Sequence, residues 1–583
     1  MGEIFVEPRI EAANLEGLKI PLDKALDRIA RRNIVSRIWD HDWTVWEDKD
    51  KEISNRLGWL EAPGEAKADL ADYERFVQSV REDGFEDALL MGMGGSSLAP
   101  EVFSKAFRRK KGFLRLHILD STSPHAVRAA QKKLNLRKTL FIVSSKSGTT
   151  VETLSFFHYF YSWVAEALGE EEAGRHFVAV SDPGTPLVAQ AGRYKFRRIF
   201  FGKADIGGRF SAFSAFGLVP AALLGIDLRR LLEDAVKISR LCRRPEARQN
   251  PGAWIGAFIG EAAGAGLDKL TFIMSDSLET LFPWLEQLIA ESTGKDGKGI
   301  LPVLETCPLG AGAFGRDRIF VLVQRGHDIA LDRAVSCLKR RRLPFIRFRM
   351  DDSLELAGHF FLWEMATAVA GNILGLNPFD QPNVESAKRM TKDVLKSFYE
   401  TGVFTSEAPK AVASGIRFYS ARSARRPEKI LTDFVAAARE RNYLVVQAFM
   451  APTPKVMGLI HELVQSLRQK TRVPVTLGFG PRYLHSTGQL HKGDGGSGLF
   501  LQLVDWDVED VAVPDIEASP CPARTFGALK AAQAWGDYMA LRELGRKIVR
   551  LDLGTRTEHG LRKITAWINE SSKKTKKAGA GAL

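Results

Sequence analysis

The 583-residue sequence has few cysteines and no apolar run long enough to cross a lipid bilayer. Its four cysteines are scattered, without the spacing of a zinc site or a disulfide framework, and this favours a reducing compartment. The first residues, Met-Gly-Glu-Ile-Phe-Val-Glu, lack the pattern of a secretory signal peptide. We therefore predict a cytoplasmic protein with no membrane segment.

The charge balance is basic, with 83 Lys and Arg residues against 70 Asp and Glu residues and a formal net charge of +13. Part of this excess lies in a Lys-rich tail at the C-terminus, and the rest is mixed with acidic residues. A positive field attracts small phosphorylated metabolites as well as nucleic acid. We expect a small phosphorylated ligand and no nucleic-acid partner.

A chain of this length contains more than one hydrophobic core, and the pattern of strands and helices divides it. Strand–turn–helix alternation, typical of parallel sheets covered by helices, begins near residue 87. The predicted division is a helical segment 1–86, a first αβα unit 87–249, a second αβα unit 250–403, a linker 404–428, a smaller α/β unit 429–570 and a basic flexible tail 571–583. The predicted fold class is α/β with mainly parallel sheets.

The most informative segment is Ser145–Thr153, Ser-Lys-Ser-Gly-Thr-Thr-Val-Glu-Thr, between a short apolar strand and a helix. The first N–H groups of a helix lack intrahelical partners and, with the positive end of the helix dipole, favour an anion. Hydroxyl groups of Ser145, Ser147, Thr149 and Thr150 add donors, and Gly148 allows close approach. Helix capping is the alternative, but it needs only one such residue. We predict a phosphate-binding turn.

Two charged residues elsewhere could act on a bound anion. Arg209 follows paired glycines beside a sheet edge, where it could face an anion or a developing negative charge, and an ordinary surface arginine is an equal alternative. Glu291 ends a predicted helix four residues after Gln287, so both side chains face the same way. The helix dipole raises the pKa of a carboxylate there, which suits a base, although most such glutamates are only solvated.

Two other patterns suggest cofactors, and neither is complete. The turn Gly92–Ser97 follows a strand as in a dinucleotide-binding fingerprint, but it lacks the final glycine and the acidic residue. His485 and His491 share the loop Tyr483–Gly493 without a third metal ligand at a credible spacing. We expect no cofactor and no metal.

Five segments, in this order, resemble the glucose-6-phosphate isomerase family over roughly residues 85–400. They are Gly92–Ser96, Ser145–Thr153, Gly207–Ser211, Glu291–Lys295 and Asn377–Lys388. The resemblance implies two sugar-isomerase (SIS) αβα domains that share a sugar-phosphate site, followed here by a smaller C-terminal α/β unit. The segment Gly478–Gly488 further resembles the isomerase half of bacterial bifunctional transaldolase/glucose-6-phosphate isomerases.

This resemblance implies a role for each matching residue. Glu291 corresponds to the base that moves a proton between C2 and C1, Arg209 to the cation that stabilises the enediolate, and Lys388 to a group near the ring oxygen and O1. The implied substrate-binding residues are Gly95, Ser96, Ser145, Lys146, Ser147, Gly148, Thr149, Thr150, Thr153, Gly208, Gln287 and Gln381. Proton abstraction beside a carbonyl independently requires a nearby base and a fixed cation for the developing charge.

One residue of the family pattern is missing. Family members typically have a histidine shortly after the base, given to the neighbouring subunit's site for ring opening, but no histidine lies between Ser292 and Gln324. We hypothesise that His485 or His491 assists ring opening, and the alternative is that both only organise their own loop.

The expected activity is interconversion of glucose 6-phosphate and fructose 6-phosphate in glycolysis and gluconeogenesis. A non-catalytic SIS-domain regulator that binds sugar phosphate is the alternative, since binding needs the Ser145–Thr150 turn but not Glu291 and Lys388 together. The expected partner is a small-molecule sugar phosphate, and a homodimer is left open.

Overall fold

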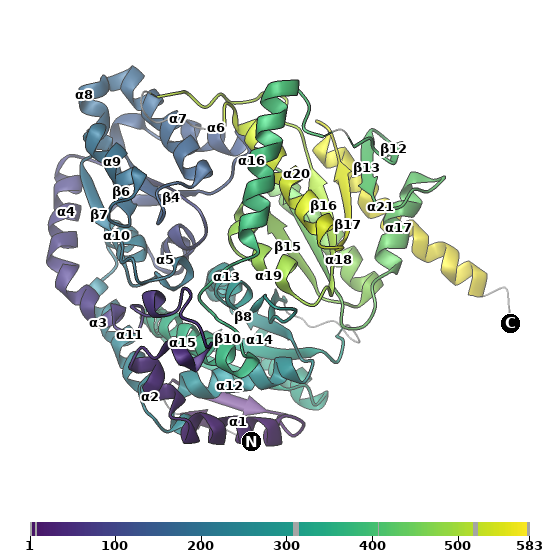
Figure 1. Cartoon of the computed structure of the whole chain (residues 1–583), viewed down its shortest axis with the longest axis horizontal. Helices are drawn as coiled ribbons and strands as arrows, with labels where there is room; N and C mark the ends of the chain where they lie inside the picture. The colour runs from purple at the N-terminus through teal and green to yellow at the C-terminus, as the bar shows by residue number, and fades with distance from the viewer. Residues whose placement is uncertain (1–2, 6–7, 307–313, 406, 517–522, 580–583) are drawn as a thin grey trace.

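The computed structural model describes residues 3–5, 8–306, 314–405, 407–516 and 523–579. Within these residues the chain forms three β-sheets, each flanked by helices (Figure 1). The predicted α/β class with mainly parallel sheets is confirmed. In the described part of the chain, no helix has both the length and the apolar character that a membrane crossing requires.

The first sheet has five parallel strands in the order β4-β3-β5-β6-β7. These strands are β3 (Asp87–Gly92), β4 (Arg115–Leu119), β5 (Thr139–Ser144), β6 (Phe177–Ser181) and β7 (Arg198–Phe201). The helices of this first unit are α5 (Leu98–Ala106), α6 (Pro124–Lys133), α7 (Val151–Leu168), α8 (Glu170–Ala173), α9 (Pro186–Arg193) and α10 (Ala215–Leu223). Its central strands are buried on both faces, which is why they are continuous apolar runs in the sequence.

The second sheet has the order β1-β2-β11-β10-β8-β9. Its parallel strands are β8 (Lys269–Met274), β9 (Leu301–Leu304), β10 (Arg318–Arg325) and β11 (Phe345–Met350). The helices of this second unit are α11 (Leu228–Cys242), α12 (Pro251–Gly264), α13 (Phe282–Thr293), α14 (Ile329–Arg340) and α15 (Leu356–Leu374). Helix α15 is buried over most of its length, as its apolar sequence predicted.

The N-terminal segment is not entirely helical, contrary to the prediction. Strands β1 (Glu3–Phe5) and β2 (Ile10–Ala13) form an antiparallel pair, and β2 pairs with β11 at the edge of the second sheet. Helices α1 (Lys19–Arg31), α2 (Ile34–Trp39), α3 (Ala62–Glu65) and α4 (Leu70–Glu82) follow. Trp59 packs against Phe210 and Phe361, with ring centroids 5.3 and 5.6 Å apart, so this segment joins the first and second units in one core.

The third sheet, of order β12-β13-β17-β16-β14-β15, forms a C-terminal unit over residues 411–579. Its strands are β12 (Ala411–Ala413), β13 (Ile416–Ser420), β14 (Tyr443–Phe449), β15 (Val475–Phe479), β16 (Gly498–Val504) and β17 (Lys547–Asp552), and its helices are α17 (Pro427–Ala436), α18 (Pro454–Thr471), α19 (Gly488–Gly493), α20 (Phe526–Glu543) and α21 (Thr557–Gly579). Helix α16 (Val384–Thr401) lies between this unit and the first one (Figure 1) and packs on α20.

One prediction about this region is wrong. The predicted linker contains the hairpin β12–β13, whose second strand pairs with β17 and so belongs to the sheet. Strands of three and five residues are too short to show a periodic pattern in the sequence, which explains the difference. In the predicted flexible tail, helix α21 continues as far as Gly579, and residues 580–583 lie outside the described residues.

Candidate active site

The predicted phosphate-binding turn, Ser145–Thr153, runs from the end of β5 into the first turn of α7, where the sequence placed it. The Ser145 and Thr150 hydroxyl oxygens are 3.0 Å apart, and so are those of Ser147 and Thr149. Thr150 occupies the N-cap position of α7, yet its side chain makes no capping hydrogen bond. This argues against the capping alternative and leaves the hydroxyl group available to a ligand.

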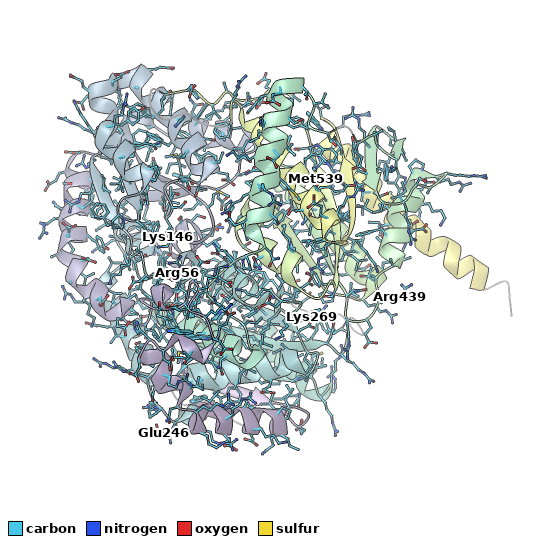
Figure 2. All side chains as sticks on the ribbon, in the orientation of Figure 1. Arg56, Lys146, Glu246, Lys269, Arg439 and Met539 are labelled. Carbon is cyan, nitrogen blue, oxygen red and sulfur yellow. The ribbon has the colours of Figure 1, made fainter. Side chains whose placement is uncertain are left out.

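Backbone geometry explains the glycine in this turn. Gly148 has a positive φ of 65°, and a Cβ atom there would lie 2.8 Å from the side chain of Thr185. Lys146, labelled in Figure 2, bonds the Asp182 carboxylate and donates to the Lys203 carbonyl at 3.1 Å. Its ammonium group is therefore already engaged beside the turn. Thr153 is buried in the first turn of α7.

The turn opens onto a cavity of about 780 Å³ between the first unit, helix α16 and the C-terminal unit. Ser147, Thr149 and Thr150 line it from the turn, and Lys388 lines it from α16. The C-terminal unit contributes the residues Leu484, His485, Lys492, Arg524, Leu529 and Gln533. Three parts of the chain that are distant in sequence therefore share one space.

Glu291 and Arg209 are both buried and lie next to each other. Glu291, near the end of α13, has its Oε1 3.6 Å from Arg209 Nη1. Arg209 is held by Ser292 Oγ, which accepts from Nε at 2.8 Å, and by Gln381 Oε1, which accepts from Nη1 at 2.9 Å. The structure thus brings together the predicted base, the predicted cation and Gln381.

Burial raises the pKa of Glu291 above its ordinary value, against the attraction of Arg209. The predicted direction agrees with this, but the main cause is desolvation and not the helix dipole. The Gln287 amide donates from Nε2 to Glu291 Oε2 at 3.0 Å, which fixes the orientation of the carboxylate. A desolvated carboxylate held beside a cation can accept a proton from a carbon acid.

The turns that contain Gly95 and Gly208 are in close backbone contact beside the Glu291–Arg209 pair. A Cβ atom on Gly95 would lie only 2.0 Å from the carbonyl oxygen of Gly208, so the contact requires glycine at position 95. Ser96, in the same turn as Gly95, is buried, and its carbonyl accepts from Ser144 Oγ at 3.1 Å. The implied residues Gly95, Ser96 and Gly208 therefore lie together near Arg209.

Lys388 and His491 are placed differently from Glu291. The Lys388 side chain is about half exposed and bonds Glu385 at 2.7 Å, on the cavity wall rather than on the buried pair. His491 is buried, with its ring 5.8 Å from that of Tyr483 and 5.1 Å from that of Phe500, and burial holds its pKa well below the ordinary value. Of the two histidines in the hypothesis, only His485 lines the cavity.

Sequence reasoning gave no role to Glu152, which contacts His485, or to Gln533, which contacts Glu152. Glu152 lies inside the recognised turn motif, and its Oε1 is 2.8 Å from His485 Nε2. Gln533, from α20, donates to the same carboxylate oxygen at 2.8 Å. Glu152 could have been singled out as the only acid in the motif, whereas Gln533 lies in an ordinary helix and carries no local signal.

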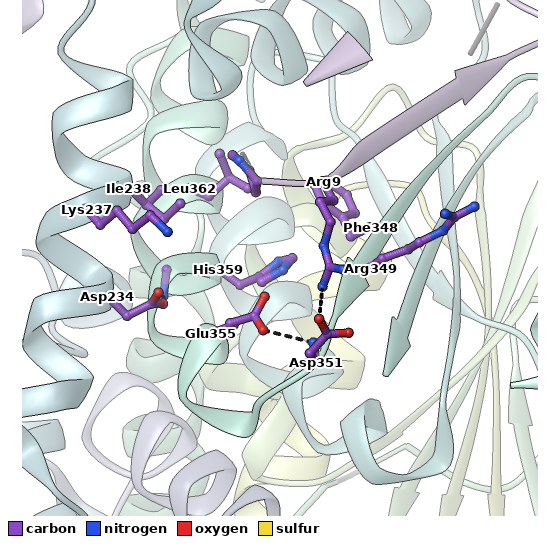
Figure 3. Close-up of a pocket in the computed structure, with 12 residues that line it drawn as sticks. Arg9, Asp234, Lys237, Ile238, Phe348, Arg349, Asp351, Glu355, His359 and Leu362 are labelled. Carbon is purple, nitrogen blue, oxygen red and sulfur yellow. Dashed lines mark hydrogen bonds and ion pairs between the residues drawn. The ribbon is translucent and has the colours of Figure 1, made fainter. Parts of the chain in front are cut away.

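Another cavity, of about 360 Å³, lies at the end of β11 between α11 and α15 (Figure 3). Arg9, Asp234 and His359 line it, and none of the predicted site residues does. The His359 ring packs edge-on against Phe348 at 5.1 Å. Among the described residues, no three His, Cys, Asp or Glu side chains are grouped so that they could hold a metal ion.

Comparison with known proteins identifies the region that contains the buried pair. Residues 77–330 match the family model described as Phosphoglucose isomerase. This region is therefore similar to the phosphoglucose isomerase family. The match includes the phosphate-binding turn, Arg209 and Glu291, and it ends before Lys388 and His485.

Named relatives agree with the family match. The chain is 29% identical over 375 residues to a glucose-6-phosphate isomerase of Rubrobacter xylanophilus, covering 54% of this chain and 84% of that protein. It is 34% identical over 253 residues to the glucose-6-phosphate isomerase of Thermus thermophilus, covering 42% and 58%. These similarities, like the family model, leave a large part of the chain unmatched.

Solved structures show the same fold. A hypothetical protein from Thermus thermophilus has a TM-score of 0.54 and 27% identity, covering 66% of this chain and 99% of that one. A glucose-6-phosphate isomerase from Chlamydia trachomatis has a TM-score of 0.51 and 19% identity, covering 63% and 78%. The phosphoglucose isomerase fold is thus present, with a further portion of chain beyond it.

Proposed function

We propose that this chain interconverts D-glucose 6-phosphate and D-fructose 6-phosphate through an enediolate, as an aldose–ketose isomerase of glycolysis and gluconeogenesis. The observation that carries the proposal is the buried Glu291–Arg209 pair, with its oxygen and nitrogen 3.6 Å apart, inside the segment that matches the phosphoglucose isomerase model. A regulator that only binds sugar phosphate has no need of a buried base with a raised pKa.

In this mechanism Glu291 removes the proton from C2 of the open-chain aldose and returns it to C1. The electron pair of the C2–H bond forms the C1=C2 double bond and the carbonyl pair moves to O1, which gives the enediolate whose negative oxygen the Arg209 guanidinium stabilises. The O2 hydroxyl proton passes to O1, and the C2=O2 carbonyl forms as C1 takes up the proton from Glu291. Gln287 orients the carboxylate and Gln381 orients the guanidinium through the bonds described above. No change of oxidation state outside the sugar is needed, because the proton and electron pair stay within it.

Substrate binding is proposed to use the cavity beside this pair. The hydroxyl groups of Ser145, Ser147, Thr149 and Thr150 and the first N–H groups of α7 hold the 6-phosphate. Gly95, Ser96 and Gly208 line the sugar, Lys388 approaches O1 from the cavity wall, and Lys146, Gly148 and Thr153 shape the turn. Phosphate binding remote from the reacting carbons supplies orientation.

The wider setting follows from the same chemistry. We propose a sugar phosphate as the ligand, no nucleic-acid partner and a cytoplasmic location, where substrates of this kind occur. The reaction as written needs neither a metal ion nor an organic cofactor.

The direct test follows conversion of fructose 6-phosphate, with glucose 6-phosphate detected by its dehydrogenase and NADP⁺, in the presence and absence of a chelator. We expect turnover in both conditions. A folded protein that binds fructose 6-phosphate in calorimetry but never converts it would support the regulator instead.

A further inference from the structure

The cavity at the end of β11, which we call the β11 cavity (Figure 3), has the size of a small-molecule site. Its volume of about 360 Å³ falls within the range of about 300–1,000 Å³ that ligand pockets occupy. Three parts of the chain enclose it: the residues Pro8 and Arg9 before β2, helix α11, and the segment that runs from the end of β11 into α15. None of the described residues that line it belongs to the proposed isomerase site, so its ligand need not be the sugar phosphate.

The wall between α11 and α15 is closely packed. A Cβ atom on Gly358 would lie 2.5 Å from Ile238 Cγ1 and 2.9 Å from Asp234 Oδ2, so the contact requires glycine at position 358. The Gly358 N–H donates to the same Asp234 oxygen at 2.9 Å. Asp234 thus serves one of the N–H groups that lack an intrahelical partner at the start of α15, and this bond fixes its carboxylate in the cavity wall.

Charged side chains of both signs line the β11 cavity in equal number. The basic ones are Arg9, Lys237 and Arg349, and the acidic ones are Asp234, Asp351 and Glu355. The cavity beside the Ser145–Thr150 turn differs, because five Lys and Arg side chains line it against three Asp and Glu side chains. An excess of positive charge suits a phosphate, whereas the balanced charge of the β11 cavity suits a ligand that carries both signs.

The charged groups of the β11 cavity are held in place. Arg9 Nη2 lies 2.9 Å from Asp351 Oδ2, and Glu355 Oε1 accepts from the backbone N–H groups of Asp351 and Asp352 at 2.9 Å from each. Burial raises the pKa of Asp234 to about 6, so its carboxylate is still mostly ionised at pH 7. The cavity therefore presents ordered carboxylates and an ordered guanidinium group together.

His359 adds a polar ring that has a hydrogen-bonding atom without a partner. The side chain lines the cavity and is only 4% exposed, and its Nδ1 has no hydrogen-bond partner among the described residues. Figure 3 shows the ring in the middle of the lining residues, with Asp234 on one side and the Arg9–Asp351 pair on the other. Burial lowers the pKa of His359 to about 4, so the ring is neutral at pH 7 and can donate or accept. Buried polar atoms normally have a partner, and a polar ligand would supply one.

Apolar side chains complete the lining. Ile238, Phe348 and Leu362 contribute hydrocarbon surface to the same cavity. Burial of an apolar group against such a surface is favourable, and a sugar phosphate has no group of this kind. A small molecule that matches the whole lining carries an ammonium group, a carboxylate and an apolar group. An α-amino acid with an apolar side chain has all three.

We propose that the β11 cavity binds an α-amino acid with an apolar side chain. The ammonium group pairs with Asp234 and bonds the His359 ring, the carboxylate pairs with Arg9, and the side chain packs on Phe348 and Leu362. This binding does not depend on the proposed isomerase function, because no residue of the isomerase site takes part in it.

The first test uses the full chain and L-leucine as the probe in isothermal titration calorimetry. We expect saturable binding of one molecule per chain. Isoamylamine lacks the carboxylate and 4-methylpentanoate lacks the ammonium group, so each loses one charged contact and should bind about 10–100-fold more weakly. Because these comparisons use the unaltered protein, they do not depend on the folding of any variant.

Substitutions then locate the site. Asp234→Asn keeps an acceptor for the Gly358 N–H but removes the charge, and Arg9→Gln removes the guanidinium group, so each should weaken L-leucine binding by about 10–100-fold. His359→Phe keeps a ring but removes both ring nitrogens and should weaken binding by about 2–10-fold. Asp433→Asn, at an exposed position on α17, is the matched control and should leave binding unchanged.

The outcomes separate this site from the isomerase site. We expect fructose 6-phosphate not to displace L-leucine, and Asp234→Asn to isomerise at the wild-type rate. The proposal is overturned by folded wild-type protein that shows no saturable binding of L-leucine up to about 10 mM, or by displacement of the probe by fructose 6-phosphate. Wild-type affinity in Asp234→Asn, Arg9→Gln and His359→Phe alike, or binding of inorganic phosphate that Arg9→Gln abolishes, would also overturn it. The assay of fructose 6-phosphate conversion tests the isomerase function separately.

Discussion

Two buried glutamates in the proposed site, Glu291 and Glu152, differ in the direction in which their surroundings shift the pKa. Glu291 lies beside Arg209, and burial raises its pKa. Glu152 is also buried, but contact with the His485 ring holds its pKa below the ordinary value. The same side chain can therefore be prepared to take up a proton in one place and to remain an anion in the other.

Geometry accounts for the difference. Arg209 Nη1 is 3.6 Å from Glu291, and the guanidinium donates its hydrogen bonds to Ser292, Gln381 and backbone carbonyls instead. Its charge therefore offsets only part of the effect of burial on the pKa of Glu291. Glu152 accepts directly from both His485 and Gln533 at 2.8 Å. At Glu291 the charge of Arg209 and the hydrogen bond from Gln287 do not outweigh burial, whereas at Glu152 the charge of the His485 ring and its direct hydrogen bond do.

The largest expected effect comes from removing the base. Glu291→Gln keeps the shape and the bond to Gln287 but cannot accept a proton, and we expect kcat to fall by about two to four orders of magnitude with KM little changed. Steady-state isomerisation kinetics measure this.

The control for this variant is Glu286→Gln on the same helix. Burial raises the pKa of Glu286 to about 8, so the residue is mostly neutral at pH 7, where glutamine resembles it. We expect near-normal turnover from Glu286→Gln. A near-normal kcat in Glu291→Gln would mean that Glu291 is not the base, and the comparison between Glu291 and Glu152 would lose its functional meaning.

A smaller effect is expected at the predicted phosphate-binding turn, which is proposed to bind the substrate on which the site acts and does not depend on the difference between Glu291 and Glu152. Thr150→Ala removes a hydroxyl group that makes no capping bond, and loss of a charge-assisted bond to phosphate costs about 1–3 kcal/mol, or roughly 5–150-fold in KM, with kcat affected less. The matched variant is Thr453→Ala, because the Thr453 hydroxyl does cap α18. It should lower thermal stability and leave KM alone, and equal KM values for wild type and Thr150→Ala would remove this hydroxyl from the phosphate site.

The smallest effect is on stability and concerns a third buried glutamate, Glu364 on α15. This residue lies outside the proposed site, so it shows how burial alone affects a glutamate. Neither carboxylate oxygen has a hydrogen-bond partner among the described residues, and burial raises the pKa well above its ordinary value. Since the folded state retains the proton, the cost of Glu364 to stability grows as pH rises above about 4.5, where the unfolded residue ionises.

We therefore expect Glu364→Gln to raise Tm by roughly 2–4 °C at pH 8.5 and to change it little at pH 5, as scanning calorimetry would show. Activity at pH 7 should not change. A variant whose stability gain is the same at both pH values would show that the Glu364 proton is not linked to folding.

The sequence was sufficient for features that depend on local patterns. Strands such as β5 are continuous apolar runs because both faces are buried, and the Ser145–Thr153 turn is recognisable because its hydroxyl groups are adjacent in sequence. The buried α15 was predicted for the same reason. These local motifs required no knowledge of tertiary contacts.

Features that depend on distant partners could not be predicted. Glu152 and His485 are 333 residues apart, and neither has a neighbour in the sequence that reveals the other. The strands of the hairpin β12–β13 are too short to separate from a linker until β17 is seen beside them. For Glu291 the direction of the pKa shift followed from the sequence, but its main cause, burial, did not.

The pairing of β2 with β11 constrains the order in which the chain can fold during synthesis. Phe348 pairs with Ile10 and Phe345 with Ala13. More than 300 further residues must therefore be synthesised after β2 before its partner strand β11 is present. Until then one edge of the second sheet has no neighbour, and such edges can pair with other chains. Strand β2 therefore joins the second sheet only after β11 has been synthesised, and shielding of its unpaired edge is expected to limit the yield of folded chains.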